Sequence, residues 1–263
     1  MFYTGRRGDA ADRAAAAGPR LVIAVGGDGT ASEVVNGLLR KAQAEAPRFG
    51  ALLAGTGADL VRSVPSPRRA EQVAGWLRSA RFRPLDAVRV GTSTGRRYFV
   101  NAADVGIGAE VVRRAAASPG FLGGTVSFLA AAVTSLLVHR NAAVRLRLDQ
   151  GPVQHLRIRT IAIANGAFLG GGMRMAPRAR PDDGLLEVVT IGDIGRLEAI
   201  GRLPLLYRGT HDRLEVVRFA SARRVEVDAD APIGVEADGE LVGSIPAVFE
   251  ILPNALRVVD WEA

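Results

Sequence analysis

The chain has 263 residues, of which 48% are hydrophobic and 23% charged, a composition that fits a globular protein and excludes a disordered one. It has no cysteine, which excludes disulfides and thiolate metal sites. The net charge of +7 favours anionic partners such as nucleotides or a phospholipid surface, whereas the 5% aromatic content, without basic–aromatic interleaving, argues against nucleic acid.

Helix and strand patterns alternate over the first third of the chain. We expect helices at 8–17, 31–44 and 69–79, and buried strands at 21–25 and from Phe49 onward. Strands that alternate with helices predict a parallel, doubly wound sheet.

Short β-rich segments dominate from about residue 84, and turn signals separate them. This texture predicts an antiparallel sandwich or a barrel-like domain. We therefore expect a nucleotide-binding α/β domain at 1–84 and a β-sandwich substrate domain at 85–245. The tail at about 246–263 is expected to pack back on the first domain.

One uncharged stretch, "FLGGTVSFLAAAVTSLLV" at 121–138, has the minimum length of a membrane span. It opens with two glycines, and Leu129, Val133, Leu136 and Leu137 mark one helical stripe. We expect a buried or surface-docked helix over 125–138.

A glycine-rich loop, "VIAVGGDGTASEVVNGLL", joins a strand to a helix at residues 22–39. Backbone amides and the positive end of the helix dipole meet there, which suits a phosphate group. Gly26, Gly27 and Gly29 allow a ligand to approach the backbone closely. The spacing alone fits an ordinary strand-to-helix turn equally well.

Thr30 and Glu33 in the same loop form the pattern T-x-x-E, which predicts a capping box at the start of the helix. The motif "GTSTG" at 91–95 fits a nucleophile elbow, but it lies between two strand patterns and predicts a hairpin loop. His139, His155 and His211 lack metal-ligand spacing.

Five motifs in this order resemble those of the diacylglycerol kinase catalytic-domain family, which includes bacterial lipid kinases and sphingosine kinases. They are "GGDGTASEVVNGLL", "LLAGTGADLVRSV" (52–64), "YFVNAADVGIGAEVV" (98–112), "IANGAFLGGGMRMAPRARPDDGLLEVVTIG" (163–192) and "VEADGEL" (235–241). The first motif alone is shared with NAD kinases and phosphofructokinases. The ordered set is specific, and it covers nearly the whole chain.

The resemblance implies a phosphofructokinase-like α/β domain followed by a β-sandwich domain, with the active site in the cleft between them. It also implies transfer of the γ-phosphoryl group of ATP to a lipid hydroxyl, with Mg²⁺. Two alternatives stay open: an NAD or sugar kinase with the same glycine loop, and a truncated, inactive paralogue that only binds lipid.

The implied substrate predicts a cytoplasmic protein that binds reversibly to an anionic membrane surface, and the oligomeric state stays open, a homodimer included. We expect an apolar contact at "FLGG" and basic contacts from arginines. These are Arg113, Arg114, Arg174, Arg178 and Arg180.

The resemblance places the nucleotide on two glycine loops and the proton transfer on a late Asp-Gly-Glu motif. The cofactor-binding residues are Gly26, Gly27, Asp28, Gly29, Thr30, Glu33, Gly55, Thr56, Gly57 and Asp59. Asp28 is expected to meet Mg²⁺ or to order its loop. Asp238 and Glu240 are the candidates for accepting the proton of the lipid hydroxyl, although Asp-Gly is also a hairpin signal. Asp182 and Asp183 are expected either to bind a second metal or to form a turn.

Three departures from the family pattern stand out. The chain begins at "MFYTGRRGDA", which resembles a point inside the family domain, so the first strand is expected to be missing. Either the true start lies upstream, or the chain is a shortened product. Ala58 replaces the usual Asn. Gly108 stands where many relatives carry Asp, with Glu110 close by.

Overall fold

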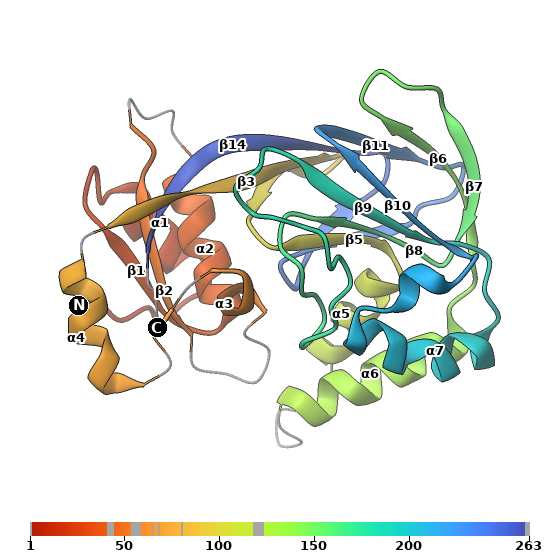
Figure 1. The fold of residues 1–263 in the computed structure, drawn as a ribbon, viewed down its shortest axis with the longest axis horizontal. Helices are drawn as coiled ribbons and strands as arrows, with labels where there is room; N and C mark the ends of the chain where they lie inside the picture. Colours follow the sequence, from red (N-terminus) through yellow and green to blue (C-terminus); the bar gives the residue numbers. More distant parts are fainter. Residues whose placement is uncertain are drawn as a thin grey trace.

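The computed structural model describes residues 2–40, 45–53, 59–64, 66–67, 69–79, 81–117 and 124–260. Its strands form one eight-stranded and one six-stranded sheet. Figure 1 shows an N-terminal lobe of helices and strands beside a larger lobe in which the two sheets face each other. The sheets are open, so the sandwich alternative is confirmed over the barrel-like one.

The N-terminal lobe contains the predicted alternation of helices and strands. Its elements in chain order are α1 (Asp9–Ala15), β1 (Val22–Gly26), α2 (Asp28–Leu38), β2 (Arg48–Leu53), α3 (Leu60–Ser63) and α4 (Ala70–Ser79). β1 and β2 are parallel, with Val22 opposite Phe49 and Gly26 opposite Leu53, and β1 is at the end of the strand order of the eight-stranded sheet.

The two faces of β2 contact helices on opposite sides of the sheet. Phe49 and Ala51 are buried in a cluster with residues of α1 and α2. Gly50 points the other way because successive residues of a strand alternate, and a Cβ placed on it would lie 2.7 Å from Cη2 of Trp76 in α4. Helices on both faces confirm the doubly wound arrangement.

Two long strands, β3 (Phe82–Thr92) and β14 (Ala247–Val259), belong to both lobes (Figure 1). They pair antiparallel along most of their length, with a register shift between Leu252 and Leu256. Beyond that shift β14 also pairs parallel with β2. The last strand of the chain thus joins the sheet of the N-terminal lobe.

The larger lobe consists of two packed antiparallel sheets. The first contains β3, β14, β4 (Gly95–Phe99), β6 (Ala142–Leu148), β7 (Gln154–Ile158) and β11 (Arg224–Asp228). The second has the order β10 (Val217–Ala222), β9 (Leu186–Ile191), β8 (Thr160–Ala164), β5 (Ala102–Gly106), β12 (Gly234–Ala237) and β13 (Glu240–Ser244). Thr92 pairs with Gly95, so "GTSTG" forms the predicted hairpin loop.

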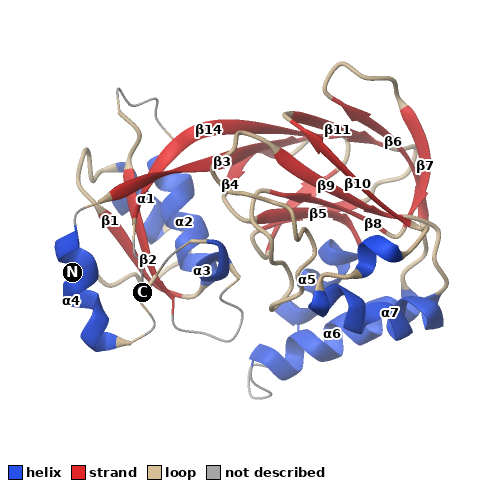
Figure 2. Ribbon diagram, in the orientation of Figure 1, coloured by secondary structure: helices blue, strands red, loops and turns tan. Residues whose placement is uncertain are grey.

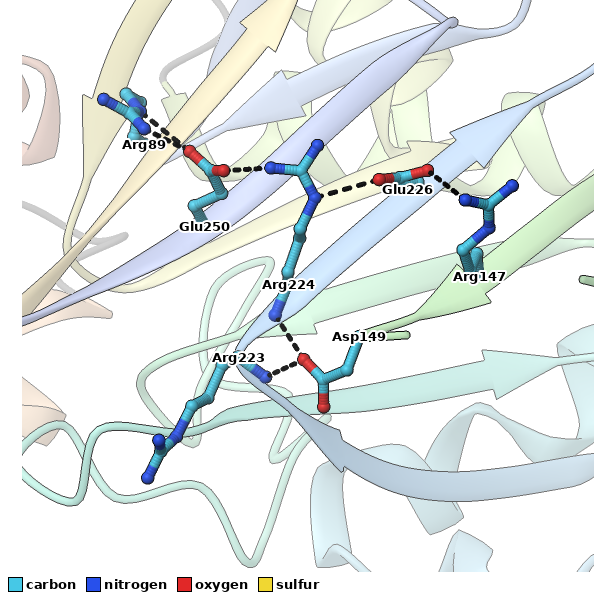
Figure 3. A network of polar contacts seen from close by, with 7 residues as sticks. All are labelled: Arg89, Arg147, Asp149, Arg223, Arg224, Glu226 and Glu250. Atoms are coloured by element: carbon cyan, nitrogen blue, oxygen red, sulfur yellow. Dashed lines mark hydrogen bonds and ion pairs between the residues drawn. The ribbon is translucent and has the colours of Figure 1, made fainter. Parts of the chain in front are cut away.

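The outer face of the first sheet carries a row of ion pairs (Figure 3). Glu250 of β14 pairs with Arg89 of β3 and with Arg224 of β11. Nε of Arg224 also lies 2.9 Å from Oε1 of Glu226, which pairs with Arg147 of β6. Inward-facing valines alternate with these charges along β11, as expected of a sheet with one solvated face.

Helices cover the outer face of the second sheet (Figures 1 and 2). They are α5 (Ile107–Ala117), α6 (Gly124–Val138), α7 (Arg196–Arg208) and the short 3₁₀ helix η2 (His211–Arg213). α6 confirms the helix predicted over 125–138. Within the described residues, every helix is too short or too polar to cross a bilayer.

Candidate active site

A cavity of about 780 Å³ connects the glycine loop with the helices that cover the second sheet. Its acidic end is lined by Asp28, Asp59, Asp104, Glu236 and Asp238. Its other end is lined mainly by aliphatic side chains of α5, α6 and α7, among them Val111, Val112, Leu136, Leu203 and Leu206. Asp28 and Asp238, predicted from distant motifs, therefore line one cavity.

The glycine loop begins its helix earlier than predicted. α2 starts at Asp28 with Gly27 as the N-cap, so Thr30 is not the cap and the predicted capping box is wrong. Glu33 instead accepts a hydrogen bond from the amide of Gly8 at 2.9 Å and ties α2 to the loop before α1. Because α2 starts at Asp28, the backbone amides of its first turn belong to the glycine motif itself.

Asp28 is a half-buried carboxylate next to a second one, Asp59. Oδ1 of Asp28 is buried without a hydrogen-bond partner. Burial raises its pKa, while the backbone amides of Asp59 and Leu60 act in the opposite direction. Asp59 lies at the N-terminus of α3, and its Oδ2 accepts a hydrogen bond from the amide of Gly171 at 2.7 Å. The negative charge of Asp28 also raises the pKa of Asp59, after burial as the main cause.

This pair of carboxylates fits a divalent cation of the Mg²⁺ type. Mg²⁺ in kinases is bound through one or two carboxylates together with substrate phosphates, and the orphaned oxygen of Asp28 has the required chemistry. The described residues contain no group of three or more metal-ligating side chains. A cation here therefore requires oxygen ligands from a substrate as well.

Asp238 lies in the turn between β12 and β13, with a left-handed φ of 48°. Its Oδ2 accepts a hydrogen bond from the amide of Val100 at 3.1 Å, and its Oδ1 accepts from Asn101 at 3.1 Å and Ala102 at 3.2 Å. Burial raises its pKa to about 6, and these three amides act in the opposite direction. The hairpin turn expected for this Asp-Gly pair exists, and its carboxylate lines the cavity.

Glu240 is held by two arginines. Its Oε2 lies 2.7 Å from Nη2 of Arg97, and its Oε1 lies 3.2 Å from Nη2 of Arg7. A Cβ placed on Gly29 would be 4.0 Å from Oε1, so Glu240 faces the glycine loop. Two cations therefore hold the carboxylate of Glu240 beside the glycine loop.

A basic recess of about 410 Å³ lies beside Glu240. Its polar lining comes from the loop before α1, from α2 and the residues after it, and from β4. It includes Arg7, Glu33, Arg40, Arg96 and Arg97. Asn36 fixes this junction, because its side-chain amide exchanges two hydrogen bonds with the backbone of Tyr98, at 2.8 and 2.9 Å. These two hydrogen bonds fix the position of α2 relative to β4.

Sequence reasoning missed two buried acidic residues, Asp104 and Glu236, each 2% exposed. They lie directly opposite each other on β5 and β12. Asp104 accepts hydrogen bonds from the amide of Gly108 at 2.7 Å and from the hydroxyl of Thr160. The available signal was a single acidic residue in each of two apolar strands, at a position that faces away from the sandwich core.

Asp104 also explains the departure at Gly108. A Cβ on Gly108 would lie 2.6 Å from Oδ1 of Asp104, so the carboxylate of Asp104 occupies the space beside position 108. Glu110 does not replace it, because both of its oxygens pair with Arg113 and Arg114. A carboxylate is therefore present here, supplied from β5 instead of α5.

Other predicted site residues lie elsewhere. Gly55, Thr56 and Gly57 are outside the described residues. Oδ1 of Asp183 accepts a hydrogen bond from the amide of Leu185 at 3.0 Å, and Oδ1 of Asp182 is 3.9 Å from Nε of Arg180. The turn interpretation accounts for these two aspartates, and the second-metal interpretation finds no cluster in the described chain.

Comparison with known proteins identifies the family. The diacylglycerol kinase catalytic domain matches residues 1–90, and the YegS C-terminal NAD kinase beta sandwich-like domain matches residues 101–260. A probable YegS-like lipid kinase of Chromohalobacter salexigens is 30% identical over 230 residues, which are 88% of this chain and 72% of that protein. A diacylglycerol kinase of Bacillus subtilis is 28% identical over 91% of this chain and 77% of its own length.

Solved structures show the same fold at low sequence identity. A putative diacylglycerol kinase from Bacillus anthracis has a TM-score of 0.74 and 20% identity, covering 98% of this chain and 84% of that one. An NAD kinase from Archaeoglobus fulgidus in complex with ATP has a TM-score of 0.51 and 15% identity, covering 91% and 77%. The matched domains span both lobes and the cavity between them, and the chain belongs to the diacylglycerol kinase catalytic-domain family, with a YegS-type C-terminal sandwich.

Proposed function

We propose that the protein is an ATP- and Mg²⁺-dependent lipid kinase that phosphorylates a hydroxyl of a diacylglycerol-like or related lipid. The observation that carries this proposal is the two-ended cavity. Its carboxylates suit phosphoryl transfer to an alcohol, and its aliphatic end suits hydrocarbon chains. Sugar and NAD acceptors have no such apolar portion to bury.

The nucleotide is proposed to bind along the glycine loop and the basic recess. The N-terminus of α2 attracts phosphate through its free amides and its dipole. Arg7 and Arg97 add positive charge next to that loop, and Glu240 holds both guanidinium groups in place. Beside its predicted role as proton acceptor, Glu240 is proposed to orient these nucleotide-binding arginines.

Asp28 is the residue that would hold Mg²⁺. The bound cation would neutralise charge on the phosphates and help to align them with the acceptor. Phosphoryl transfer depends mainly on positioning and charge neutralisation.

Asp238 is proposed to accept the proton of the lipid hydroxyl. Three backbone amides fix its carboxylate, so it is oriented without any conformational change. Its pKa of about 6 leaves it ionised at neutral pH and still basic enough to take up a proton. The apolar walls of the cavity exclude water, which limits wasteful hydrolysis of ATP.

The lipid substrate requires contact with a membrane, and α6 and α7 offer a surface for it. Leu137, Val138 and Leu197 are exposed there, Leu197 to 81%. Of the arginines predicted for this role, Arg113 and Arg114 pair with Glu110, and residues 121–123 of "FLGG" are outside the described residues.

We expect the Leu197→Gln variant to sediment less with anionic liposomes than the unaltered protein. Equal sedimentation with neutral and anionic liposomes would remove the membrane proposal.

The deciding experiment is phosphorylation of a lipid panel with radiolabelled ATP and Mg²⁺. The panel contains diacylglycerol, phosphatidylglycerol and sphingoid bases, with NAD as a further acceptor. Labelled lipid, absent with Asp238→Asn, supports the proposal. Labelled NAD without labelled lipid contradicts it, and binding of lipid without binding of Mg·ATP would indicate a lipid-binding protein that is not a kinase.

A further inference from the structure

Glu236 is a buried carboxylic acid without a cationic partner. It is 2% exposed, and the described residues offer it no ion pair. Within the described part of the chain it accepts one hydrogen bond, from the amide of Gly239 to Oε2, at 3.0 Å. A buried carboxylate with so little compensation is unfavourable, so the geometry favours the protonated form.

The groups around Glu236 are acidic. Asp104 lies opposite it on β5, and Asp238 stands two residues later, in the turn after β12. Burial is the main cause that raises the pKa of Glu236 well above its ordinary value, and the charges of Asp104, Asp238 and Asp59 add to it. Like charges directly opposite on paired strands repel, and a proton on Glu236 relieves that repulsion.

Asp104 and Glu236 are not equivalent partners for that proton. Asp104 already accepts two hydrogen bonds, from the amide of Gly108 and the hydroxyl of Thr160, which stabilise its charged form. Among the described residues, Glu236 accepts one, from Gly239. This difference in hydrogen bonding favours protonation of Glu236 over protonation of Asp104.

Glu236 lies on the face of the second sheet that the helices cover. Its neighbours Val235 and Ala237 point into the sandwich core, so the side chain of Glu236 points to the opposite face. Asp104, directly across from it, accepts a hydrogen bond from the amide of Gly108 in α5 on that same face. Both Glu236 and Asp238 line the cavity. The O–H group of a protonated Glu236 would therefore lie close to the head group of a lipid whose hydroxyl is bound at Asp238.

We propose that Glu236 works as a neutral carboxylic acid that donates a hydrogen bond to a second oxygen of the acceptor, next to the hydroxyl that is phosphorylated. This inference rests on the proposed lipid kinase activity and narrows its acceptor. The preferred acceptor carries an ester, ether or hydroxyl oxygen on the neighbouring carbon, as glycerol-type lipids do. A simple long-chain alcohol lacks that oxygen.

Two variants distinguish a role of Glu236 as hydrogen-bond donor from a role of its negative charge. Glu236→Gln keeps a hydrogen-bond donor, and Glu236→Met keeps the length without one. With dioctanoylglycerol as acceptor, we expect Glu236→Gln to stay within about 3-fold of the unaltered protein and Glu236→Met to lose on the order of 10- to 100-fold in kcat/KM. With a long-chain fatty alcohol, the two variants should differ much less.

The pH profile is the second readout. As pH rises through the pKa of Glu236 the O–H group is lost, so activity with dioctanoylglycerol should fall at alkaline pH. Glu236→Gln should lack this alkaline limb. If Glu236→Gln is as damaging as Glu236→Met, the carboxylate charge is what matters and the inference is overturned.

Infrared spectroscopy tests the protonation state without any activity. The difference spectrum between the unaltered protein and Glu236→Gln at pH 7.5 should contain the carbonyl band of a protonated carboxylic acid. Absence of that band overturns the inference even if lipids are phosphorylated. Should no lipid be phosphorylated at all, the proposed function fails, and the band together with weaker binding of dioctanoylglycerol by Glu236→Met still supports the role of Glu236.

Discussion

The side chain of Asp104 fills the space that a side chain at Gly108 would need, and both residues line the cavity. The amide of Gly108 donates to Oδ1 of Asp104 at 2.7 Å, and a side chain at position 108 would begin 2.6 Å from the same oxygen. This space can thus hold a carboxylate from position 104 or from position 108, but not from both.

This relationship predicts strong coupling between the two positions. Gly108→Asp alone should destabilise the protein by about 1–3 kcal/mol through overpacking, with added charge repulsion. Asp104→Gly alone should remove the carboxylate with the two hydrogen bonds that it accepts, and so lower the free energy of unfolding. The double variant Asp104→Gly/Gly108→Asp should recover, with a coupling free energy of about 1–3 kcal/mol in a cycle of unfolding measurements. Additive effects would show that the two side chains do not compete for this space.

Asp238 should determine the acidic limb of the activity profile. Its ionised form is the proton acceptor, so activity should rise as pH increases through about 6, before the alkaline limb expected from Glu236 begins. Asp238→Asn should reduce kcat by about 10²- to 10⁴-fold. Asp104 also has a raised pKa of about 6, so Asp104→Asn is the matched control and should keep the limb. A profile unchanged in shape by Asp238→Asn would rule out Asp238 as the base.

We expect Arg97 to contribute to the binding of ATP and not to the binding of the lipid. Removing it leaves Glu240 with one cation beside the glycine loop. We expect Arg97→Ala to raise the KM for ATP by about 10-fold or more, because hydrogen bonds to charged groups are worth about 1.5–3 kcal/mol. Arg89→Ala, which breaks an ion pair with Glu250 on the outer sheet face, is the control (Figure 3). It should change stability by at most about 1 kcal/mol and leave both KM values unaltered. An equal effect of both variants on the KM for ATP would contradict a nucleotide site in the recess.

Filling the apolar end of the cavity should select against long acyl chains. Ala132 of α6 lines the cavity, whereas Ala130 of the same helix is exposed and does not. Ala132→Phe should raise the KM for long-chain lipids while short-chain lipids and Mg·ATP are handled as before. Ala130→Phe should change none of these. Chain-length profiles measured with both variants decide the matter, and identical profiles would place the acyl chains outside this cavity.

Gly50 should tolerate no side chain. A Cβ there would lie 2.7 Å from Cη2 of Trp76, which is fully buried. We expect Gly50→Ala to lower the free energy of unfolding by about 1–3 kcal/mol. Gly91 of β3 has open space, with Val248 O at 4.0 Å as its nearest neighbour, so Gly91→Ala is the control in thermal melts. A Gly50→Ala protein as stable as Gly91→Ala would mean that Trp76 moves aside freely.

Periodicity and turn signals predicted most of the fold. The strands of the sandwich and the helices near 8–17, 69–79 and 125–138 follow from local patterns that tertiary contacts reinforce. α7 was missed because Gly201 and Pro204 weaken its helical pattern. Neighbouring helices and the sheet below supply the stability that its own sequence lacks.

The candidate site was predictable where residues carry a motif. Asp28 and Asp238 stand in recognisable loops, and both line the cavity. Asp104 and Glu236 stand in strands without a motif, and only the pairing of β5 with β12 brings them together. The partners of Glu240 were hidden for the same reason, because Arg7 and Arg97 reach it from two other elements. Long-range pairing of this kind has no local sequence signal.

The pairing of β14 with β2 has a consequence for synthesis on the ribosome. Residues 257 and 258 pair with β2, which together with β1 lies before residue 54. The lobe that is translated first can therefore finish folding only after β14 has emerged. Until then β2 has an open edge, so the nascent chain needs protection from aggregation until more than 200 further residues have been translated.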